Sequence, residues 1–387
     1  MIVSEKGCWV IRSSLAKPSP TALQHACTIL SQVLNMTETA GNASVQVVRA
    51  NSVTDRSHRP VFVMGCHRSR TNLLYDTLLS AGGFAVYRGY LPIYKILIPH
   101  FGHPRNPTNR KRIVDTFMRS KGFARTGLQA SDLSSKLLEN CRNGGDFLRI
   151  VMGDIARTQG MKRWAVYDPD SVLHVARIRA DIPEALFVHI IRDGRDIALS
   201  LMKMGGFRPF PWSRQSRGLL ETALYWQWMV RTGMRQGCQI PSDYIEIHYE
   251  DLVTQPDSTL EKLGQFLHHD LNYDRIQGVG LGRVRESNSS FLDEGPASGQ
   301  HPVSRWKERL TEQEVASLEA LVGPCLEECG YRLTGTAPQR KLSWRWTCLS
   351  AAYPWLLNTK LWLKLNTPLG RLADISALEL TAPPEAD

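Results

Sequence analysis

The feature that most constrains the fold is a buried strand that runs straight into a helix through a turn rich in hydrogen-bond donors. Residues 61–64 (VFVM) form a short continuous apolar run, which is typical of a strand buried on both faces. A helix is expected over 71–79, with Leu73, Leu74 and Leu78 on one face. Because the N-terminal end of a helix carries partial positive charge, the turn predicts an anion-binding site. Its residues are Gly65, Cys66, His67, Arg68, Ser69, Arg70, Thr71 and Asn72.

This turn differs from the loop of ATP and GTP hydrolases. That loop needs Gly-Lys-Ser/Thr after its variable residues, whereas Arg70, Thr71 and Asn72 stand there in this chain. The lysine that neutralises a transferring γ-phosphate is therefore missing, and the sequence argues against a standard nucleoside triphosphate hydrolase.

The rest of the chain alternates strands with helices. Strands are expected over 84–87, 164–167, 186–191 and 244–249, and helices over 196–202, 258–267 and about 312–329, the last opened by a capping box from Thr311 to Glu314. This alternation predicts an α/β fold of the P-loop nucleotide-binding type, with a parallel sheet covered by helices on both faces. We expect one domain over 59–335, a partly helical or disordered N-terminal extension over 1–58 with a helix at 21–34, and a C-terminal appendage over 336–387.

Charge and composition restrict which kinds of ligand or partner the chain is expected to bind. The 387 residues hold 47 Lys and Arg against 37 Asp and Glu, a net charge of +10, which favours an anionic partner such as a nucleotide, a sulfated or phosphorylated ligand or an anionic lipid surface. The 8 Cys form no C-x-x-C pair, so neither a zinc site nor a disulfide framework is indicated. We expect no metal and no nucleic-acid partner.

The two ends of the chain bear on its location. The first residues contain no sustained apolar stretch, so we expect no secretory signal and a cytoplasmic protein. The Trp- and Leu-rich segment 344–365 is interrupted by Pro354 and carries three basic residues, which favours a helix packed on the domain surface. Peripheral membrane contact through this tail remains the alternative. The sequence leaves the oligomeric state open.

A second cluster of cations follows the clearest strand. Arg192 stands at the end of the run 186–191, and Ser200 lies two helical turns further on. Because ligands of open α/β sheets bind outside the carboxyl ends of the strands, this cluster is expected beside the first turn. Arg192 would grip a phosphate, while Asp193 and Asp196 would orient arginines or cap the helix rather than catalyse.

Taken in order, these segments resemble the sulfotransferases that use 3′-phosphoadenosine 5′-phosphosulfate (PAPS), in the bacterial, carbohydrate-type and tyrosylprotein-like branch. The turn from Gly65 to Leu74 is similar to their Gly-x-x-Arg-Ser-Gly-Thr-Thr-Leu-Leu, with Arg70 in place of Gly and Asn72 in place of Thr. Their Arg-Asp-x-Arg-Asp motif and its following Ser match 192–196 and Ser200. Two more segments, 249–252 (YEDL) and 305–306 (RW), follow in the family's order, so the resemblance spans about 60–332.

The resemblance implies a site for PAPS as co-substrate. Gly65 to Asn72 would bind its 5′-phosphosulfate, chiefly through Arg68, Ser69, Thr71 and Asn72. Arg192 and Ser200 would bind the 3′-phosphate, and the region of Arg305 and Trp306 would close over the nucleotide. The acceptor would be a hydroxyl, or an amine, of a carbohydrate, a lipid or a small metabolite. Sulfuryl transfer needs positive charge where the leaving oxygen becomes negative, and Arg68 is expected to supply it.

The general base is the open point. Relatives place a Glu shortly after the second strand, but residues 87–92 (YRGYLP) contain no carboxylate, and Tyr90 stands at the corresponding place. A tyrosine of ordinary pKa, about 10, is a poor base at neutral pH. Asp168, at the end of the strand expected over 164–167, is the next candidate.

Two alternatives stay open beside a sulfotransferase. Arg70, Asn72 and the missing Glu are compatible with a degenerate relative that binds the nucleotide but transfers little or nothing. The other alternative is an atypical P-loop kinase, which should bind Mg-ATP more tightly than PAPS.

Overall fold

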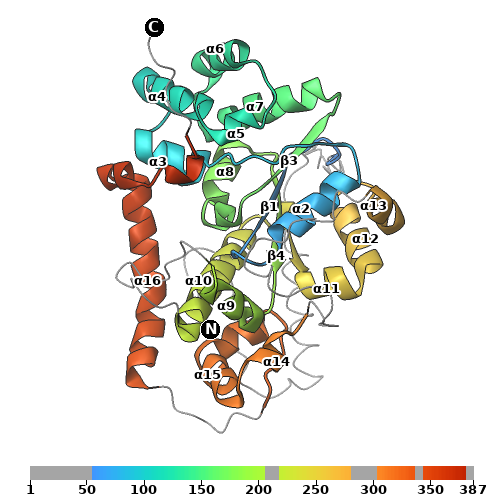
Figure 1. Ribbon diagram of the computed structural model, residues 1–387, viewed down its shortest axis with the longest axis vertical. Helices are drawn as coiled ribbons and strands as arrows, with labels where there is room; N and C mark the ends of the chain where they lie inside the picture. The colour runs from blue at the N-terminus through green and yellow to red at the C-terminus, as the bar shows by residue number, and fades with distance from the viewer. Residues whose placement is uncertain (1–54, 205–217, 280–302, 336–342, 381–387) are drawn as a thin grey trace, which may run out of the picture. The chain divides into compact units, whose positions relative to one another are not determined.

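A computed structural model describes residues 55–204, 218–279, 303–335 and 343–380 of the chain (Figure 1). These residues belong to one compact unit, Asp55–Asp387. The helix predicted over 21–34 and nearly all of the predicted extension 1–58 lie outside the described residues.

The described residues form a parallel sheet in the order β2-β3-β1-β4-β5. Its strands are β1 (Val61–Gly65), β2 (Phe84–Ala85), β3 (Arg163–Tyr167), β4 (Leu186–Ile191) and β5 (Tyr244–His248). Four of them match the predicted strands to within one residue at either end, whereas β2 is shorter than the strand predicted over 84–87. β1 lies at the centre and pairs with β3 and β4, so the turns that follow these three strands meet at one edge of the sheet.

Helices cover both faces of the sheet, as the alternating pattern predicted (Figure 1). One face carries α2 (Thr71–Ser80), α11 (Tyr249–Thr254), α12 (Pro256–Leu267) and α13 (Tyr273–Val279). The other carries α7 (Gly144–Thr158), α8 (Val175–Asp181), α9 (Gly194–Met202), α10 (Leu219–Gly237), α15 (Glu312–Glu328) and α16 (Trp344–Asn366). The shorter or peripheral helices are α3 (Ile98–Phe101), α4 (Pro107–Met118), α5 (Lys121–Ala124), α6 (Ala130–Asn140) and α14 (Trp306–Arg309). The fold is therefore α/β, as predicted.

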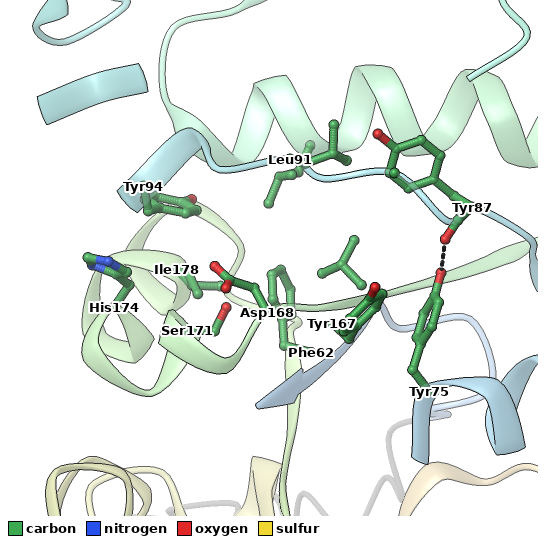
Figure 2. A pocket seen from close by; sticks show the side chains of 13 residues that line it. Phe62, Tyr75, Tyr87, Leu91, Tyr94, Tyr167, Asp168, Ser171, His174 and Ile178 are labelled. Carbon is green, nitrogen blue, oxygen red and sulfur yellow. Dashed lines mark hydrogen bonds between the residues drawn. The ribbon is translucent and has the colours of Figure 1, made fainter. Parts of the chain in front are cut away.

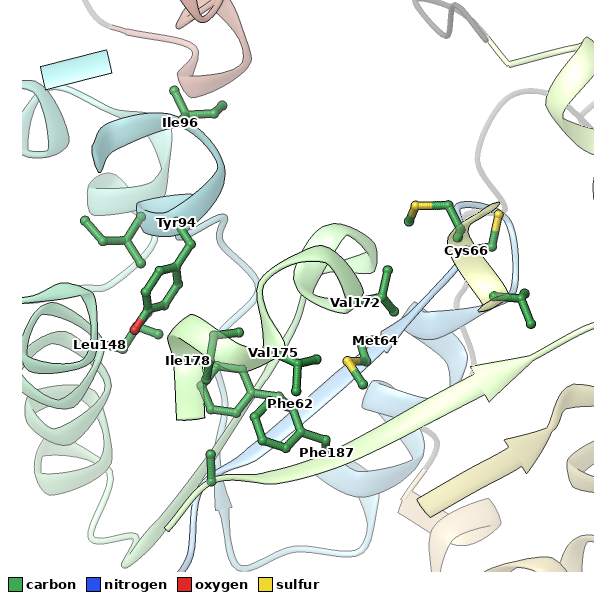
Figure 3. Close-up of a cluster of buried hydrophobic side chains, with 14 of the residues drawn as sticks. Phe62, Met64, Cys66, Tyr94, Ile96, Leu148, Val172, Val175, Ile178 and Phe187 are labelled. Carbon is green, nitrogen blue, oxygen red and sulfur yellow. The ribbon is translucent and has the colours of Figure 1, made fainter. Parts of the chain in front are cut away.

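The core is divided by the sheet into two apolar layers. Successive side chains of a strand point to opposite faces. Phe62 and Met64 accordingly pack with Phe187 in the larger layer (Figure 3), while Val61 and Val63 pack in the smaller one. Because β1 and β4 are buried on both faces, their carboxyl ends are held firmly where the two predicted anion sites begin.

The C-terminal helix α16 continues through Pro354, where the sequence pattern suggested an interruption. Tyr353 and Leu357 of this helix are buried against the larger layer. This packing offsets the roughly 3 kcal/mol by which proline disfavours a helix interior. None of the helices in the described ranges combines the length and the apolar character that crossing a membrane requires.

Candidate active site

The first turn approaches β4 so closely that Gly65 has no room for a side chain. A Cβ atom at Gly65 would lie 2.4 Å from the carbonyl oxygen of Ile190. The chain then adopts the left-handed conformation at two arginines, with φ of 72° at Arg68 and 68° at Arg70. Left-handed backbone costs an L-residue about 1–2 kcal/mol. Arg70 therefore occupies a conformation that glycine adopts readily, and the sequence departs from the family pattern at a strained position.

The side chains of the first turn divide into two groups. Ser69 is fully buried, and its Oγ has no hydrogen-bond partner among the described residues. A buried hydroxyl of this kind is stabilised when a ligand accepts a hydrogen bond from it. Cys66, by contrast, belongs to the apolar core, and the His67 Nε2 lies 3.3 Å from Asp170 Oδ1. The Cys66 side chain thus packs in the core and the His67 side chain contacts Asp170. We therefore expect these two residues to contribute to nucleotide binding through their backbone N–H groups.

The two predicted anion sites meet. Arg68 Nε donates a hydrogen bond of 2.8 Å to Ser200 Oγ, across 132 residues of sequence. Arg192 Nη1 donates to the Arg68 carbonyl at 3.4 Å. The turns after β1 and β4 therefore form one continuous cationic surface, which is the juxtaposition that the sequence predicted.

Arg192 is oriented by groups on both sides of its guanidinium. Its Nη2 lies 3.3 Å from Asp196 Oδ2, and its guanidinium carbon lies 4.6 Å from the centre of the Tyr249 ring. Beside it opens a pocket in which Asp196 is the one acidic residue among the described lining residues. The pocket is lined by Arg192, Asp196, Leu199, Ser200, Lys203, Arg305 and Arg309.

This concentration of cations changes the electrostatics of the first turn. Burial lowers the pKa of Arg68, and the charges of Arg70 and Arg192 lower it further. Burial also lowers the pKa of Arg70, as do Arg192 and Arg305, whereas a hydrogen bond with Tyr249 acts in the opposite direction. Cations that lower one another's pKa are stabilised by an anion placed among them.

Behind the second turn lies a network of buried ion pairs. Arg195 is 2.7 Å from Asp193 Oδ2 and 2.6 Å from Glu319 Oε1, and all three side chains are buried. Asp193 Oδ1 also accepts a hydrogen bond of 2.9 Å from the Arg195 N–H and caps α9. Glu250 accepts from the Asp193 N–H at 3.0 Å, and Asp196 accepts from the Trp306 N–H at 2.9 Å. Asp193 and Asp196 therefore brace arginines and a helix end, as expected.

Trp306 does not line the cationic pocket. Its side chain is buried, and the Arg195 guanidinium lies 3.9 Å from its ring. Of the pair predicted to close over the nucleotide, Arg305 lines the pocket and Trp306 supports the turn behind it.

Asp168 follows β3 and lies beside the first turn. Burial raises its pKa to about 6, with a further contribution from Asp170, while Lys95 and His67 act in the opposite direction. Asp170 differs: although burial acts to raise its pKa, His67 and Lys95 hold it well below the ordinary value. Of the two neighbouring carboxylates, Asp168 is therefore the one whose pKa lies near neutrality, where a general base is effective.

Tyr90, the other candidate base, lies in the same cluster. Burial raises its pKa above the ordinary value, and the negative charge of Asp168 adds to the effect. Its hydroxyl thus stays protonated at neutral pH, so burial and neighbouring charge favour Asp168 over Tyr90 as a proton acceptor.

A small cavity lies beside Asp168. Figure 2 shows the Asp168 carboxylate directed into this cavity, among aromatic side chains from several segments. Four of these are tyrosines, namely Tyr75, Tyr87, Tyr94 and Tyr167. The described wall is thus mainly aromatic, and Asp168 is the carboxylate among its residues.

Sequence patterns missed several residues of the site. Lys95 pairs with Asp170, Glu319 completes the network around Arg195, and Lys203 and Arg309 line the cationic pocket. Asp170 carried a signal, because it stands two residues after Asp168 at the end of a predicted strand. Lys203 and Arg309 also carried a signal, because each stands about one helical turn after a predicted residue, Ser200 or Arg305. Lys95 and Glu319 carried none, since their partners lie far away in the sequence. No group of three or more His, Cys, Asp or Glu side chains that could hold a metal ion occurs in the described part of the chain.

Solved structures similar to the chain include a sulfotransferase domain from the Synechococcus PCC 7002 olefin synthase, at 16% identity and a TM-score of 0.45, covering 71% of this chain and 95% of that one. A sulfotransferase domain from the curacin biosynthetic pathway shares 14% identity at a TM-score of 0.42, covering 71% and 98%. A mouse sulfotransferase complexed with PAP shares 13% identity at a TM-score of 0.37, covering 76% and 89%.

No curated protein sequence matches the chain. A family model described as "Sulfotransferase family" does, over residues 60–273, which is more than half of the chain and includes the turns after β1, β3 and β4. The chain therefore belongs to the sulfotransferase family.

Proposed function

We propose that this protein transfers a sulfuryl group from PAPS to a hydroxyl, or an amine, of a carbohydrate, lipid or small-metabolite acceptor. The observation that carries the proposal is the junction of the two cationic turns, where Arg68 Nε lies 2.8 Å from Ser200 Oγ. A ligand with two anionic ends suits two cationic sites that share one surface, and PAPS carries a phosphosulfate at one end and a 3′-phosphate at the other.

The nucleotide would bind along this surface. In this proposal Arg68, Ser69, Thr71 and Asn72 hold the 5′-phosphosulfate at the N-terminal end of α2. The unpartnered Ser69 Oγ among the described residues and the lowered pKa values of Arg68 and Arg70 support an anion there. Arg192, Ser200 and Arg305, which line one pocket, would hold the 3′-phosphate.

Two groups would carry the chemistry. When sulfuryl transfer begins, negative charge builds on the leaving oxygen of the nucleotide, and Arg68 is the cation we assign to stabilise it. Asp168 would accept the proton of the acceptor hydroxyl from its position in the aromatic cavity. Because its pKa is raised to about 6, Asp168 would be ionised at pH 7 and still basic enough to act.

The test is transfer from labelled PAPS to a panel of alcohols, phenols and sugars. We expect turnover by the unmodified protein, with kcat/KM falling as the pH drops below about 6, since Asp168 must be deprotonated to act. Asp168→Asn should lower kcat by about 10²–10⁴-fold without weakening binding of PAP. Asp257→Asn, which alters an exposed carboxylate on α12, is the matched control and should change neither.

Other outcomes would replace the proposal. Binding of PAP without turnover on any acceptor would identify a relative that has lost transfer. Stronger thermal stabilisation by Mg-ATP than by PAPS would instead identify a kinase.

A further inference from the structure

Helix α16 carries three exposed tryptophans on one face. Trp344, Trp355 and Trp362 retain 73%, 67% and 59% of their accessible surface. Trp355 follows Trp344 by 11 residues and Trp362 follows it by 18, which are about three and five whole turns at 3.6 residues per turn. The three rings therefore form one stripe along the helix, which we call the tryptophan stripe.

The opposite face of α16 anchors the helix to the domain. Tyr353 and Leu357 lie about half a turn from the tryptophan stripe, and they are only 1% and 9% exposed. Trp228 Nε1 of α10 also donates a hydrogen bond of 2.9 Å to Asn358 Oδ1. Packing against the domain thus explains one face of α16 and leaves the stripe unexplained.

Exposed tryptophan is peculiar to this helix among the described residues. Trp164, Trp226, Trp228 and Trp306 are all buried, and Trp346 is partly buried. Just beyond α16, Leu369 and Leu372 are also exposed, at 52% and 81%. A run of large exposed apolar side chains of this kind marks an interaction surface rather than ordinary solvent exposure.

The charge of the segment indicates the partner. Residues 344–373 contain Arg345, Lys360, Lys364 and Arg371 and no Asp or Glu. Tryptophan and basic side chains together suit the boundary of an anionic bilayer, where the ring lies among the headgroups and the cation meets lipid phosphate or carboxylate.

Two other occupants lack this complementarity. A second copy of the segment 344–373 would bring its own four basic residues against the same four. Residues 1–54 carry Lys6, Arg12, Lys17 and Arg49 against Glu5 and Glu38, so 4 − 2 gives +2, again a positive charge. Neither therefore offers a negatively charged surface to the basic residues of 344–373.

We propose that α16 and the exposed leucines after it dock the protein on the surface of an anionic lipid bilayer. The tryptophan stripe lies in the headgroup region. Arg345, about a quarter turn from the stripe, and Arg371, beyond the end of the helix, contact the anionic lipids. The helix lies along the bilayer and does not cross it.

Co-sedimentation of the full-length protein with lipid vesicles tests this proposal. Phosphatidylcholine vesicles containing phosphatidylserine should bind the protein, and pure phosphatidylcholine vesicles should bind it at least about tenfold less well, about 1.4 kcal/mol. Raising the salt concentration should weaken the binding, and tryptophan fluorescence should shift to shorter wavelength on binding.

Variants assign the binding to α16. The triple change Trp344→Ser, Trp355→Ser and Trp362→Ser should lower binding at least tenfold (about 1.4 kcal/mol), with an unchanged melting temperature because the three side chains are exposed. Arg345→Glu with Arg371→Glu should remove the preference for anionic lipid. The matched control is Met161→Ser with Val279→Ser, two exposed apolar residues on other elements, and it should bind like the unmodified protein.

Three results would overturn the proposal. The first is equal binding by the unmodified protein and the triple tryptophan variant. The second is a dimer in solution that the triple variant converts to a monomer, which would make a second copy the occupant. The third is faster proteolysis within residues 1–54 in the triple variant, which would mean that this segment covers the stripe. None of these readouts needs transferase activity, so the proposed function is tested separately.

Discussion

The turns after β1 and β4 present cations to the same surface, but they are held in different ways. The second turn is stabilised by partners within the protein: Arg195 pairs with Asp193 and Glu319, Asp196 with Arg192, and Glu250 with the backbone of Asp193. The buried carboxylates therefore face cations or N–H donors whether or not a nucleotide is bound. This turn is a preorganised half of the site.

The first turn has fewer stabilising contacts among the described residues. Arg68 and Arg70 both have left-handed backbone, and each is surrounded by further cations that lower its pKa in addition to the effect of burial. The Ser69 hydroxyl is buried without a hydrogen-bond partner in the described ranges. The comparison shows that the fold preorganises the second turn, and we propose that a bound anion completes the first.

The largest expected effect is on the stability of the second turn. Arg195→Ala leaves the buried carboxylates of Asp193 and Glu319 without their shared cation, and it should lower the free energy of unfolding by about 3–5 kcal/mol. Chemical denaturation measures this. Arg231→Ala is the control, because its pair with Glu328 is exposed at 39% and 49% and should contribute less than about 1 kcal/mol. Equal losses in the two variants would show that the ion-pair network does not hold the turn.

Nucleotide affinity tests whether the preorganised turn contributes to binding. Arg192→Ala removes a cation already oriented by Asp196 and Tyr249, and the Kd for PAP should rise at least tenfold, about 1.4 kcal/mol. Titration calorimetry gives the value. Arg157→Ala is the control, because Arg157 is 70% exposed and distant in sequence from both turns, and it should leave the Kd unchanged. An unaltered Kd for Arg192→Ala would remove Arg192 from the site.

The sequence predicted the strands well because their signal is local. The run 186–191 (LFVHII) is apolar except at His189 and matches β4 at both ends, since a strand buried on both faces favours apolar residues along its whole length. The meeting of the turns after β1 and β4 was also predictable, because parallel strands bring their carboxyl ends to one edge. Pro354 was misleading: contacts of Tyr353 and Leu357 with the rest of the fold keep α16 continuous, and such contacts are not visible in a local pattern.

Features that depend on distant residues could not be predicted. Glu319 lies 124 residues from Arg195 in the sequence, and nothing near either residue indicates the pair. The choice between Tyr90 and Asp168 as base depends on burial and neighbouring charge, which raise both pKa values and favour only the carboxylate as a proton acceptor at neutral pH. The sequence identified Arg70 as a departure from the family pattern, but only the backbone shows that its φ is positive.

Arg70→Gly is the smallest and most discriminating change. Glycine removes the strain of the left-handed backbone, which stabilises the folded state by about 1–2 kcal/mol. The greater conformational entropy of glycine in the unfolded chain offsets about 0.5–1 kcal/mol of this gain. The melting temperature should therefore rise slightly.

Binding of PAP by the same variant should nevertheless weaken, because a guanidinium near Arg192 and Arg305 is lost. Arg70→Lys keeps the charge and the strain, so it should bind PAP nearly as well as the unmodified protein without the gain in stability. If Arg70→Gly binds PAP more tightly, then Arg70 crowds the phosphate instead of contacting it. In that case Arg70 impairs the first turn, and the idea that a bound nucleotide completes this turn is wrong.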